Sequence, residues 1–508
     1  MSTTIKIKSA LLSVYYKDRL EEVLKECDRL NIKLYSTGGT QEFIEKNGYK
    51  STTVESLTNY PSVFGGRVKT LHPKVFGGIL ARRQNTQDQS ELKQYDIPEI
   101  DLIVVDLYPF EETLKKTSDE AEIIEKIDIG GIALIRGAAK NFNDVLIISS
   151  RDQYNDLIKL LKEQNGEITL EQRKHFAALA FGVSSGYDTA IFKYFNKDKT
   201  IPFFRESYSN GQVLRYGENP HQQGIFYGQL NEIFDKLHGK ELSYNNLVDT
   251  DAAMQLISEF TEPTFAVIKH TNACGVASAD TALNAWKRAL AGDPVSAFGG
   301  VIICNKHIDE ETAKEIDKLF LEILIAPSFD EAGLKILQQK KNRIILKYKA
   351  VEFSKRQFKT VLNGVLEQDV DNKLETADDL KPVTNSKPTP EQISDLLFAN
   401  KICKHIKSNA MVLAKDKQLV GMGCGQTSRV DAFKQAIAKA KAFGFEVKGT
   451  VLASDAYFPF ADNVQIAYEN GVTAIVQPGG SVKDKDSIEY CNTHNLPMVF
   501  TGFRHFKH

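Results

Sequence analysis

The chain has 508 residues, which is too many for one compact core, so two to four domains are expected. Hydrophobic residues make up 42% and charged residues 26%, an ordinary globular composition. The formal net charge of −2 excludes a global basic field that would attract nucleic acid. An anionic ligand must therefore be held by local clusters of charge.

Cysteine usage and hydropathy set the expected compartment. The six cysteines lie far apart and form no C-x-x-C pair, so neither a disulfide framework nor a zinc knuckle is expected. No segment has the length of a membrane span, and residues 1–16 resemble a first strand rather than a signal peptide. We therefore expect a cytoplasmic protein with reduced thiols and no membrane partner.

The first region alternates apolar strands with helical stretches. The predicted strands are IKSALLSVY (7–15), IKLYSTGGT (32–40), DLIVVDLYPF (101–110) and DVLIISS (144–150), and residues 17–32 have helical spacing. This alternation predicts an α/β fold with a parallel, doubly wound sheet. Ligands of such sheets bind beyond the carboxyl ends of the strands, where STGGT and LYPF lie.

The segment FNKDKTIPFF (195–204) is polar, contains a proline and follows a helical stretch, so it marks a domain boundary. We predict one domain over 1–198 and a second over 199–508. In the second, FAVIKH (265–270) is a buried strand, and TPEQISDLL (389–397) begins a helix with a capping box. The sequence contains no convincing repeat.

The first candidate site combines a Gly-rich turn with a basic loop. Gly38 and Gly39 let backbone N–H groups approach an anion, and Arg67, Lys69 and Lys74 add positive charge nearby. The alternative is a tight turn beside a solvated basic loop, and this explanation is about equally good for the cluster alone.

The second candidate site consists of Tyr108, Asp128 and Lys140, each at the edge of an apolar segment. Together they can polarise a carbonyl and move protons. Taken singly, a Tyr or Asp in such a place is more often a capping or packing residue.

The third candidate site is KHTNACG (269–275), at the mouth of a buried strand. His270 titrates near neutrality and can act as a base, while Lys269 can stabilise developing negative charge. The alternative is an exposed loop histidine beside a solvated lysine. Cys274 is expected to be packed rather than nucleophilic.

Several well-known motifs are absent. GMGCGQ (421–426) does not match the dinucleotide fingerprint, and no P-loop occurs. The zinc-deaminase signature is also missing, so a zinc deaminase is not favoured and no metal is predicted.

Many uncommon strings nevertheless occur in a fixed order. The first region contains GGRVKTLHP, LYPF, IDIGG and AAKN, and the second contains LRYGENPHQ, KHTNACG, SAFGG, IAP, SNA, GQTSR, SDAYFPF and FRHF. Over essentially its whole length the chain resembles the bifunctional family that combines AICAR formyltransferase with IMP cyclohydrolase.

The resemblance implies a fold and two reactions. It implies an N-terminal domain similar to methylglyoxal synthase and a C-terminal region of two subdomains similar to cytidine deaminase, without the zinc. The formyl group of 10-formyltetrahydrofolate would pass to the 5-amino group of AICAR, and the formyl-AICAR would then close to IMP with loss of water. It also implies a homodimer, with the transferase site at the subunit interface. A non-catalytic phosphate sensor in the first region remains the alternative.

The resemblance also implies residue roles. His270 matches the base, Lys269 assists charge and proton movement, and Asn409 supports the tetrahedral intermediate. The expected cyclohydrolase residues are Lys69, Tyr108, Asp128 and Lys140. The expected substrate contacts are Ser13, Lys17, Ser36, Thr37, Gly38, Gly39, Thr40, Arg67, Thr70, Arg215, Tyr216, Phe298, Gly299, Glu322, Arg429, Tyr457, Asp462 and Arg504.

The chain departs from the family pattern at a few positions. The family often has SVSDKTG where this chain has SVYYKDR (13–19), which puts some nucleotide contacts of that loop in doubt. Asp106 stands where many members have Asn, and an ionised Asp cannot donate a hydrogen bond. Ala273 replaces a proline, and Glu322 stands where some members have Asp.

Overall fold

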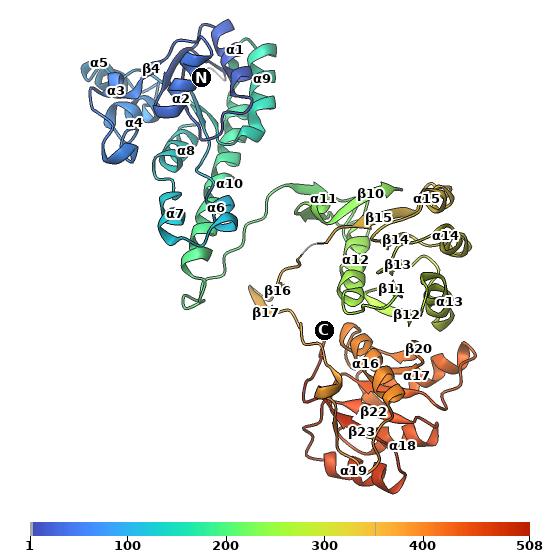
Figure 1. Ribbon diagram of the computed structural model, residues 1–508. Coiled ribbons are helices and arrows are strands. Elements are labelled where there is room, and N and C mark those ends of the chain that lie inside the picture. Colours follow the sequence, from blue (N-terminus) through green and yellow to red (C-terminus); the bar gives the residue numbers. More distant parts are fainter. Residues whose placement is uncertain (1–3, 351) are drawn as a thin grey trace. The chain divides into compact units, whose positions relative to one another are not determined.

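The computed structural model describes residues 4–350 and 352–508 and divides into two compact units, Met1–Ser209 and Asn210–His508 (Figure 1). The division falls after residue 209, whereas the sequence placed it after 198. Residues beyond the last helix of the first unit fold back on that helix, because the ring of Phe203 stacks on Phe192 with centroids 6.3 Å apart. The polar, proline-containing segment therefore packs with the first unit.

The first unit is built on one parallel sheet with strand order β4-β3-β2-β5-β6. The strands of the unit are β1 (Thr4–Lys6), β2 (Ser9–Ser13), β3 (Lys33–Ser36), β4 (Thr52–Thr53), β5 (Leu102–Val105), β6 (Leu146–Ile148) and β7 (Glu167–Thr169), of which β1 and β7 form a separate antiparallel pair. Its helices are α1 (Leu20–Arg29), α2 (Gly38–Lys46), α3 (Val54–Thr58), α4 (Pro73–Leu80), α5 (Thr86–Gln94), α6 (Phe110–Lys116), α7 (Glu120–Glu125), α8 (Gly130–Lys140), α9 (Tyr154–Glu163) and α10 (Leu170–Phe195). The predicted doubly wound sheet is confirmed.

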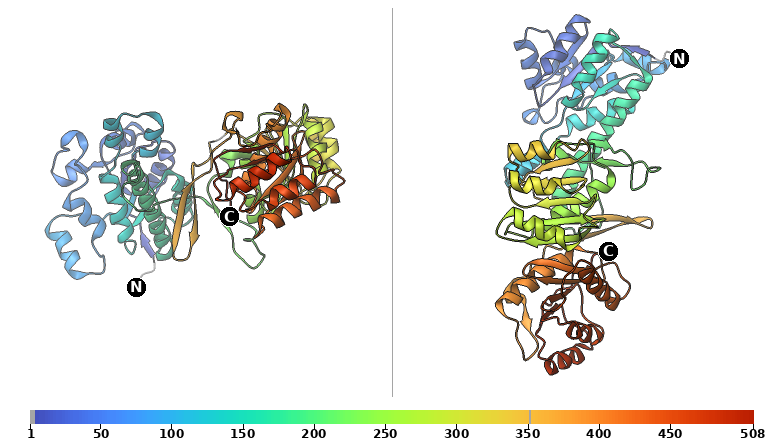
Figure 2. Two further views of the ribbon diagram at one scale, coloured as in Figure 1. Left: turned by 90° about the horizontal axis from the view of Figure 1, so that it is seen from below. Right: turned by 90° about the vertical axis from the view of Figure 1, so that its right-hand side faces the viewer.

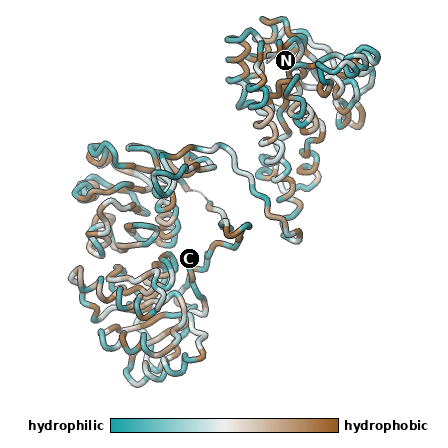
Figure 3. Tube along the Cα trace, turned by 180° about the vertical axis from the view of Figure 1, so that it is seen from behind, coloured by the Kyte–Doolittle hydropathy of each residue, from teal (hydrophilic) through white to brown (hydrophobic). Residues whose placement is uncertain are grey.

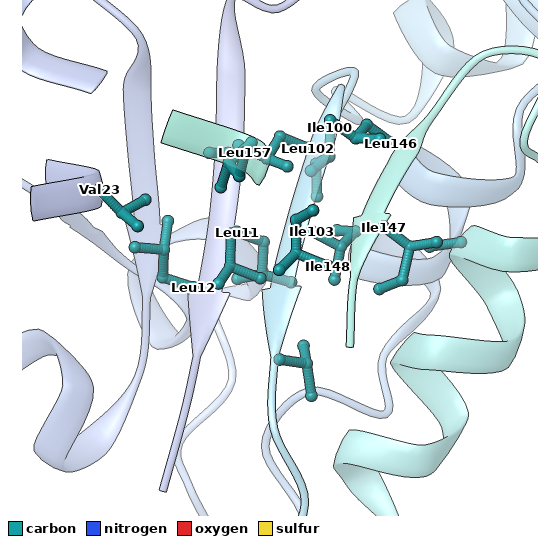
Figure 4. Close-up of a cluster of buried hydrophobic side chains, with 14 of the residues drawn as sticks. Leu11, Leu12, Val23, Ile100, Leu102, Ile103, Leu146, Ile147, Ile148 and Leu157 are labelled. Atoms are coloured by element: carbon teal, nitrogen blue, oxygen red, sulfur yellow. The ribbon is translucent and has the colours of Figure 1, made fainter. Parts of the chain in front are cut away.

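The central strands of this sheet are apolar on both faces. Leu11, Leu12, Leu102 and Ile103 are fully buried, and Figure 4 shows such side chains on neighbouring strands packing together. Continuous apolar runs of this kind are expected when helices cover both faces of a parallel sheet. The core therefore holds the strands in place, and loops follow at their carboxyl ends.

The second unit contains a twelve-stranded sheet with order β10-β15-β14-β13-β11-β12-β20-β19-β21-β22-β23-β18. The strands of the unit are β8 (Gly211–Val213), β9 (Ile225–Tyr227), β10 (Phe234–His238), β11 (Thr264–Lys269), β12 (Asn272–Ser278), β13 (Val301–Cys304), β14 (Ile323–Ala326), β15 (Ile344–Tyr348), β16 (Arg356–Val361), β17 (Gly364–Asp369), β18 (Lys381–Pro382), β19 (Met411–Lys415), β20 (Gln418–Gly423), β21 (Val451–Ser454), β22 (Ala474–Gln477) and β23 (Met498–Phe500). The helices are α11 (Leu230–Ile233), α12 (Tyr244–Ile257), α13 (Ala282–Gly292), α14 (Glu310–Asp317), α15 (Glu331–Leu337), α16 (Pro390–His405), α17 (Arg429–Ala442), α18 (Asp462–Glu469) and α19 (Asp484–Thr493).

The sheet of the second unit consists of two copies of one topology. In the first copy the hairpin β11–β12 is followed by β13 antiparallel to β11, and then by β14 and β15 in parallel. The hairpin β19–β20 is followed by β21, β22 and β23 in the same arrangement. The sequence revealed no repeat because the two copies share a pattern of burial rather than residue identities. This duplication matches the two subdomains that the resemblance implied.

The copies join edge to edge, and the helices cover both faces of the common sheet (Figure 2). One face packs on α12 and α16 as a single core, whereas α13 and α17 each cover one copy on the other face. Hydrophobic residues accordingly concentrate along the strands of both units (Figure 3). Among the described residues, no helix is long and apolar enough to cross a membrane.

Candidate active sites

The first site lies at the carboxyl ends of β2, β3 and β5. Helix α2 begins at Gly38, immediately after β3, so its free N–H groups face the loop region. Gly38 has a φ of 53°, and a Cβ added there would lie 3.2 Å from Lys69 Nζ. A helix N-terminus with a lysine at this distance is suited to an anion such as phosphate.

The hydroxyl residues of this loop hold the backbone. Ser36 Oγ donates to the Leu12 carbonyl at 2.8 Å, and Thr40 Oγ1 donates to the Val14 carbonyl at 2.9 Å. Thr37 donates to Glu55 at 3.3 Å, and all three side chains are buried. The cradle is therefore mainly backbone N–H, stabilised from behind by the predicted hydroxyl groups. Ser13 ends β2 beside it, and Gly39 has open space around its Cα.

Positive charge gathers near the cradle. Burial lowers the pKa of the Lys17 ammonium, the charge of Asp106 raises it, and the charge of Lys69 lowers it. Lys69 also lowers the pKa of Asp128 against the larger, opposite effect of burial. The charge of Lys69 thus acts on both Lys17 and Asp128.

Asp128 and Tyr108 are neighbours at this site. The Tyr108 N–H donates to Asp128 Oδ2 at 3.4 Å, and the Gly131 N–H donates to Asp128 Oδ1 at 2.6 Å. Asp128 is buried, and burial raises its pKa, whereas Tyr108 remains 40% exposed. Asp128 therefore caps the start of α8, as the capping explanation expected, and its chemical role stays a prediction.

The altered loop SVYYKDR is accommodated by Asp106. The backbone N–H groups of Tyr15 and Tyr16 donate to its two carboxylate oxygens, the second at 3.1 Å. An asparagine has only one acceptor oxygen for these donors. The Tyr15 ring meets Tyr108 edge to face, with centroids 5.7 Å apart. The sequence analysis noted Asp106 and the altered loop as separate departures from the family pattern, but it did not connect them.

Three further predicted residues of this unit have different surroundings. Lys140 is exposed at the last position of α8, about 15 Å along the helix axis from Gly130. Arg67 pairs with Glu125 at 2.8 Å, and both side chains are largely exposed. Thr70 is buried beside Gly130, where an added Cβ would lie 3.1 Å from its hydroxyl.

The second site lies along one edge of the twelve-stranded sheet. Because β12 and β20 are antiparallel, the carboxyl end of β11 lies at the same edge as the amino end of β19. The pairing of the other strands places the amino ends of β13 and β14 at this edge too. It also places the carboxyl ends of β21, β22 and β23 there. Residues that are far apart in the sequence therefore lie along one edge of the sheet. At this edge, the residues near β13 and β14 come before the strand and not after it.

Lys269 ends β11 and His270 occupies the hairpin turn that follows. Lys269 Nζ donates to the Phe298 carbonyl at 2.5 Å and lies near Gly299, where an added Cβ would be 3.6 Å away. His270 is exposed and has a φ of 50°. Cys274 is 6% exposed, and burial raises its pKa to about 12, so the expected packing role is confirmed.

Asn409 is held by the second copy and linked to the first. Its side-chain oxygen accepts from Arg429 at 2.8 Å, and its side-chain nitrogen donates to the Gln426 carbonyl at 2.9 Å. The Lys407 N–H donates to Asn272 Oδ1 at 3.0 Å. Lys407 is two residues before Asn409, and Asn272 is two residues after His270, so this bond joins the two segments that contain these predicted transfer residues.

Arg429 is the centre of a buried network. Its guanidinium bonds Asp455, which is fully buried, and Ser454 Oγ at 3.1 Å. Ser408 Oγ also donates to Asp455, at 2.6 Å. Asp455 was missed by sequence reasoning, although it lies within the string SDAYFPF.

Glu322, at the start of β14, is surrounded by polar partners. Asn246 Nδ2 donates to it at 2.8 Å, and Lys240 Nζ lies 3.2 Å away. Burial raises the pKa of Glu322, but these bonds and the nearby charges of Lys240 and Arg215 lower it overall. Arg215 stacks on Tyr216 and donates to its hydroxyl at 2.7 Å. Lys240 and Asn246 were missed, because no motif singled them out.

The remaining predicted contacts follow β21 and β23. Tyr457 is 41% exposed just after β21, and Asp462 begins α18. Arg504 lies beyond β23 with its guanidinium 4.3 Å from the centroid of the Phe506 ring. These residues lie on the same edge of the sheet as Asn409. Within residues 4–350 and 352–508, no group of three or more His, Cys, Asp or Glu is placed to hold a metal ion.

Comparison with known proteins shows the family of the chain. The family described as "AICARFT/IMPCHase bienzyme" matches residues 138–439, and the "MGS-like domain" matches residues 19–133. The Bifunctional purine biosynthesis protein PurH of Bacteroides thetaiotaomicron is 58% identical over the full length of both chains. The protein of the same name from Acetivibrio thermocellus is 46% identical over 99% of this chain and all of its own.

A solved structure titled "Crystal structure of ForH" is 36% identical over 37% of this chain and 99% of its own, with a TM-score of 0.33. The full-length relatives support two activities on one chain and not a phosphate sensor fused to a transferase. The chain belongs to the AICARFT/IMPCHase bienzyme family, whose members combine AICAR formyltransferase with IMP cyclohydrolase.

Proposed function

We propose that each unit of this enzyme of purine synthesis carries one of the two family reactions. The edge of the twelve-stranded sheet transfers the formyl group of 10-formyltetrahydrofolate to AICAR, and the first unit closes formyl-AICAR to IMP. The observation that carries this proposal is the bond between Asn272 and Lys407, which joins the His270 turn to Asn409.

In the transfer step, the 5-amino nitrogen of AICAR attacks the formyl carbon and His270 takes the amine proton. Lys269 and the Asn409 side chain stabilise the oxygen of the tetrahedral intermediate. The bond from the formyl carbon to the folate nitrogen then breaks, and that nitrogen is reprotonated. Arg215 and Arg504 are suited to the phosphate of AICAR.

The test is His270→Ala with His307→Ala as the matched control. His307 is also exposed, but it bonds Ser328 and Asp330 at the opposite edge of the sheet. We expect His270→Ala to lose folate-dependent formylation by about 10²–10⁴-fold while cyclisation of added formyl-AICAR continues. Transfer at the wild-type rate in His270→Ala would contradict the assignment.

In the first unit, the carboxamide nitrogen of formyl-AICAR attacks the formyl carbon and water leaves. Lys69 and Tyr108 polarise the formyl oxygen, Asp128 orients them, and the N-terminus of α2 holds the phosphate. Lys140 matches the family motif but lies at the far end of α8, so its role stays a prediction.

The domain boundary is tested with two fragments. Residues 1–209 retain the contact of Phe203 with Phe192 and the ion pair of Lys193 with Glu206, whereas residues 1–198 lack both. We expect the longer fragment to cyclise formyl-AICAR at a rate close to that of the full chain and to melt at a higher temperature. A folded but inactive longer fragment would refute independent catalysis.

We further propose that the protein is cytoplasmic and works as a homodimer on these small molecules. Family membership supports both statements. Light scattering coupled to gel filtration should give twice the mass of the 56.8 kDa chain, and a monomer that retains full transfer activity would contradict the dimer.

A further inference from the structure

The hairpin that carries Lys269 and His270 has a structural copy in the other half of the sheet. The strands β11 and β12 meet at the turn His270–Thr271, and β19 and β20 meet at Asp416–Lys417. All four turn residues have positive φ, from 50° to 64°. Both hairpins also contain a register shift in the residues that lead into the turn. The two turns therefore share one backbone conformation.

The residue types of the first turn do not by themselves account for this conformation. Two-residue turns with positive φ at both positions favour Asn, Asp and Gly. His270 is a residue type that tolerates positive φ, but Thr271 is a poor choice because its side chain is branched at Cβ. A group outside the turn must therefore stabilise it.

A carboxylate on the preceding helix provides that group in both copies. The Thr271 N–H donates to Asp249 Oδ1 at 2.7 Å, and a hydrogen bond from the His270 backbone also acts on Asp249. In the second copy, Asp395 accepts from the Asp416 N–H at 2.8 Å and from the Lys417 N–H at 2.7 Å.

The helices place these two carboxylates equivalently. Helix α12 is capped by Ser243 and α16 by Thr389, each with a capping box. Asp249 and Asp395 lie at the same distance from these caps and at the same distance before their turns. Both helices belong to the buried core on one face of the sheet, so each carboxylate is presented from a rigid element.

The copies differ in what the turn carries. The lysine is kept, because Lys415 ends β19 as Lys269 ends β11, and Lys415 also lies beside a glycine with positive φ, Gly449. The histidine is not kept, because Asp416 takes the place of His270. The carboxylate and its turn thus persist in the second copy, where the histidine is absent. The carboxylate therefore supports the turn independently of any role of the histidine in formyl transfer.

We propose that Asp249 is a positioning residue for formyl transfer, holding the His270–Thr271 turn through its backbone N–H groups so that His270 meets the substrate amine. This inference rests on the proposed role of His270 in transfer. The side chain of Asp249 itself acts on the backbone and takes no proton from the substrate.

The experiment compares Asp249→Asn with its internal control Asp395→Asn in the full-length protein. An asparagine has one acceptor oxygen, and its NH₂ group faces the second backbone donor, so each turn loses its support in the same way. We measure kcat and KM for formylation of AICAR, cyclisation of added formyl-AICAR, and thermal unfolding.

We expect both variants to lower the unfolding temperature by similar amounts and to leave cyclisation unchanged. Only Asp249→Asn should lower kcat of transfer, by about 10²-fold, because a misplacement near 1 Å has that effect. KM for AICAR should stay the same, since Arg215 and Arg504 are untouched. Equal transfer kcat in the two variants would overturn the inference, and so would a change confined to KM.

Two further variants keep the test decisive. If Asp249→Asn loses its folded state, Asp249→Glu is compared with Asp395→Glu, and again only the first should lower kcat. His270→Ala separates the two hypotheses. Wild-type transfer in His270→Ala contradicts the proposed function, whereas its loss there and its retention in Asp249→Asn contradict the positioning role alone.

Discussion

The two units build their sites from different materials. In the first unit, one parallel sheet brings together loops that follow β2, β3 and β5, and the anion cradle is mainly the backbone at the start of α2. In the second unit, two copies of one topology meet, and the Asn272 side chain of one copy accepts from the Lys407 backbone N–H of the other.

This difference predicts different tolerance to substitution. A backbone cradle accepts new side chains if the loop is still held, and Asp106 holds the loop that contains Tyr15 and Tyr16. A network such as Arg429, Asp455 and Asn409 requires each member, because a lost partner leaves a buried polar group unpaired.

The largest effect is expected for Arg429→Met. Asp455 is fully buried and would lose its guanidinium partner, which costs about 3–5 kcal/mol. Urea unfolding should show a weakened transition for the second unit, transfer should be lost, and cyclisation should remain. Lys434→Met, on the exposed face of the same helix, is the control. Unchanged stability in Arg429→Met would show that the network is dispensable.

Lys69→Ala tests the first unit in the same way. Removing the cation beside the α2 cradle should lower cyclisation by about 10²–10³-fold and leave transfer unchanged. Lys74→Ala is the control, because Lys74 Nζ pairs with the exposed Asp96, at 3.5 Å. Equal cyclisation rates in the two variants would remove Lys69 from the site.

A pH effect on stability is expected in the second unit. Burial lowers the pKa of His505, but the hydrogen bonds that its ring donates to Asp371 and Glu375 outweigh this effect and raise the pKa to about 9. The unfolded value is about 6.5, so this contribution is present in full below pH about 6.5 and is lost as pH rises through about 9. It amounts to about 3 kcal/mol.

Melting of the second unit between pH 6 and 10 measures this contribution. The wild type should lose stability relative to His505→Gln as pH rises, and His508→Gln, at the exposed terminus, should behave like the wild type. A constant difference between wild type and His505→Gln across this range would rule out the titration.

The smallest effect is expected for Asp106→Asn. One of the two backbone donors loses its acceptor, at a cost of about 1 kcal/mol, and cyclisation should fall slightly. In the background Tyr15→Ser, Tyr16→Asp, which restores the usual family residues, the same change should become neutral or stabilising because two carboxylates no longer repel. Additive effects in this double-mutant cycle would disprove the coupling.

Much of the fold could be predicted from local pattern. The apolar runs predicted β2, β5 and β6, the helical spacing predicted α1, and Thr389 with Gln392 predicted the start of α16; the structure confirms all of these. The alternation of strands and helices also predicted the parallel sheet of the first unit. These features depend on periodicity and capping, which are properties of neighbouring residues.

The sites were only partly predictable for a physical reason. The uncommon strings named Lys269, His270 and Asn409, but a buried partner such as Asp249 or Asp455 has no short-range signature. Its importance depends on which N–H or guanidinium faces it in the folded chain. Lys140 shows the converse, because its motif named it while the length of α8 separates it from Asp128.

The sequence by itself determined the two α/β regions, the family and the motifs that contain the predicted site residues, because these features depend on residues that are close together in the chain. Only the tertiary structure decided that β12 and β20 join antiparallel, so that the carboxyl end of β11 meets the amino end of β19. It alone revealed that the second unit is a duplication, since buried apolar residues can exchange freely while their positions in the fold are kept.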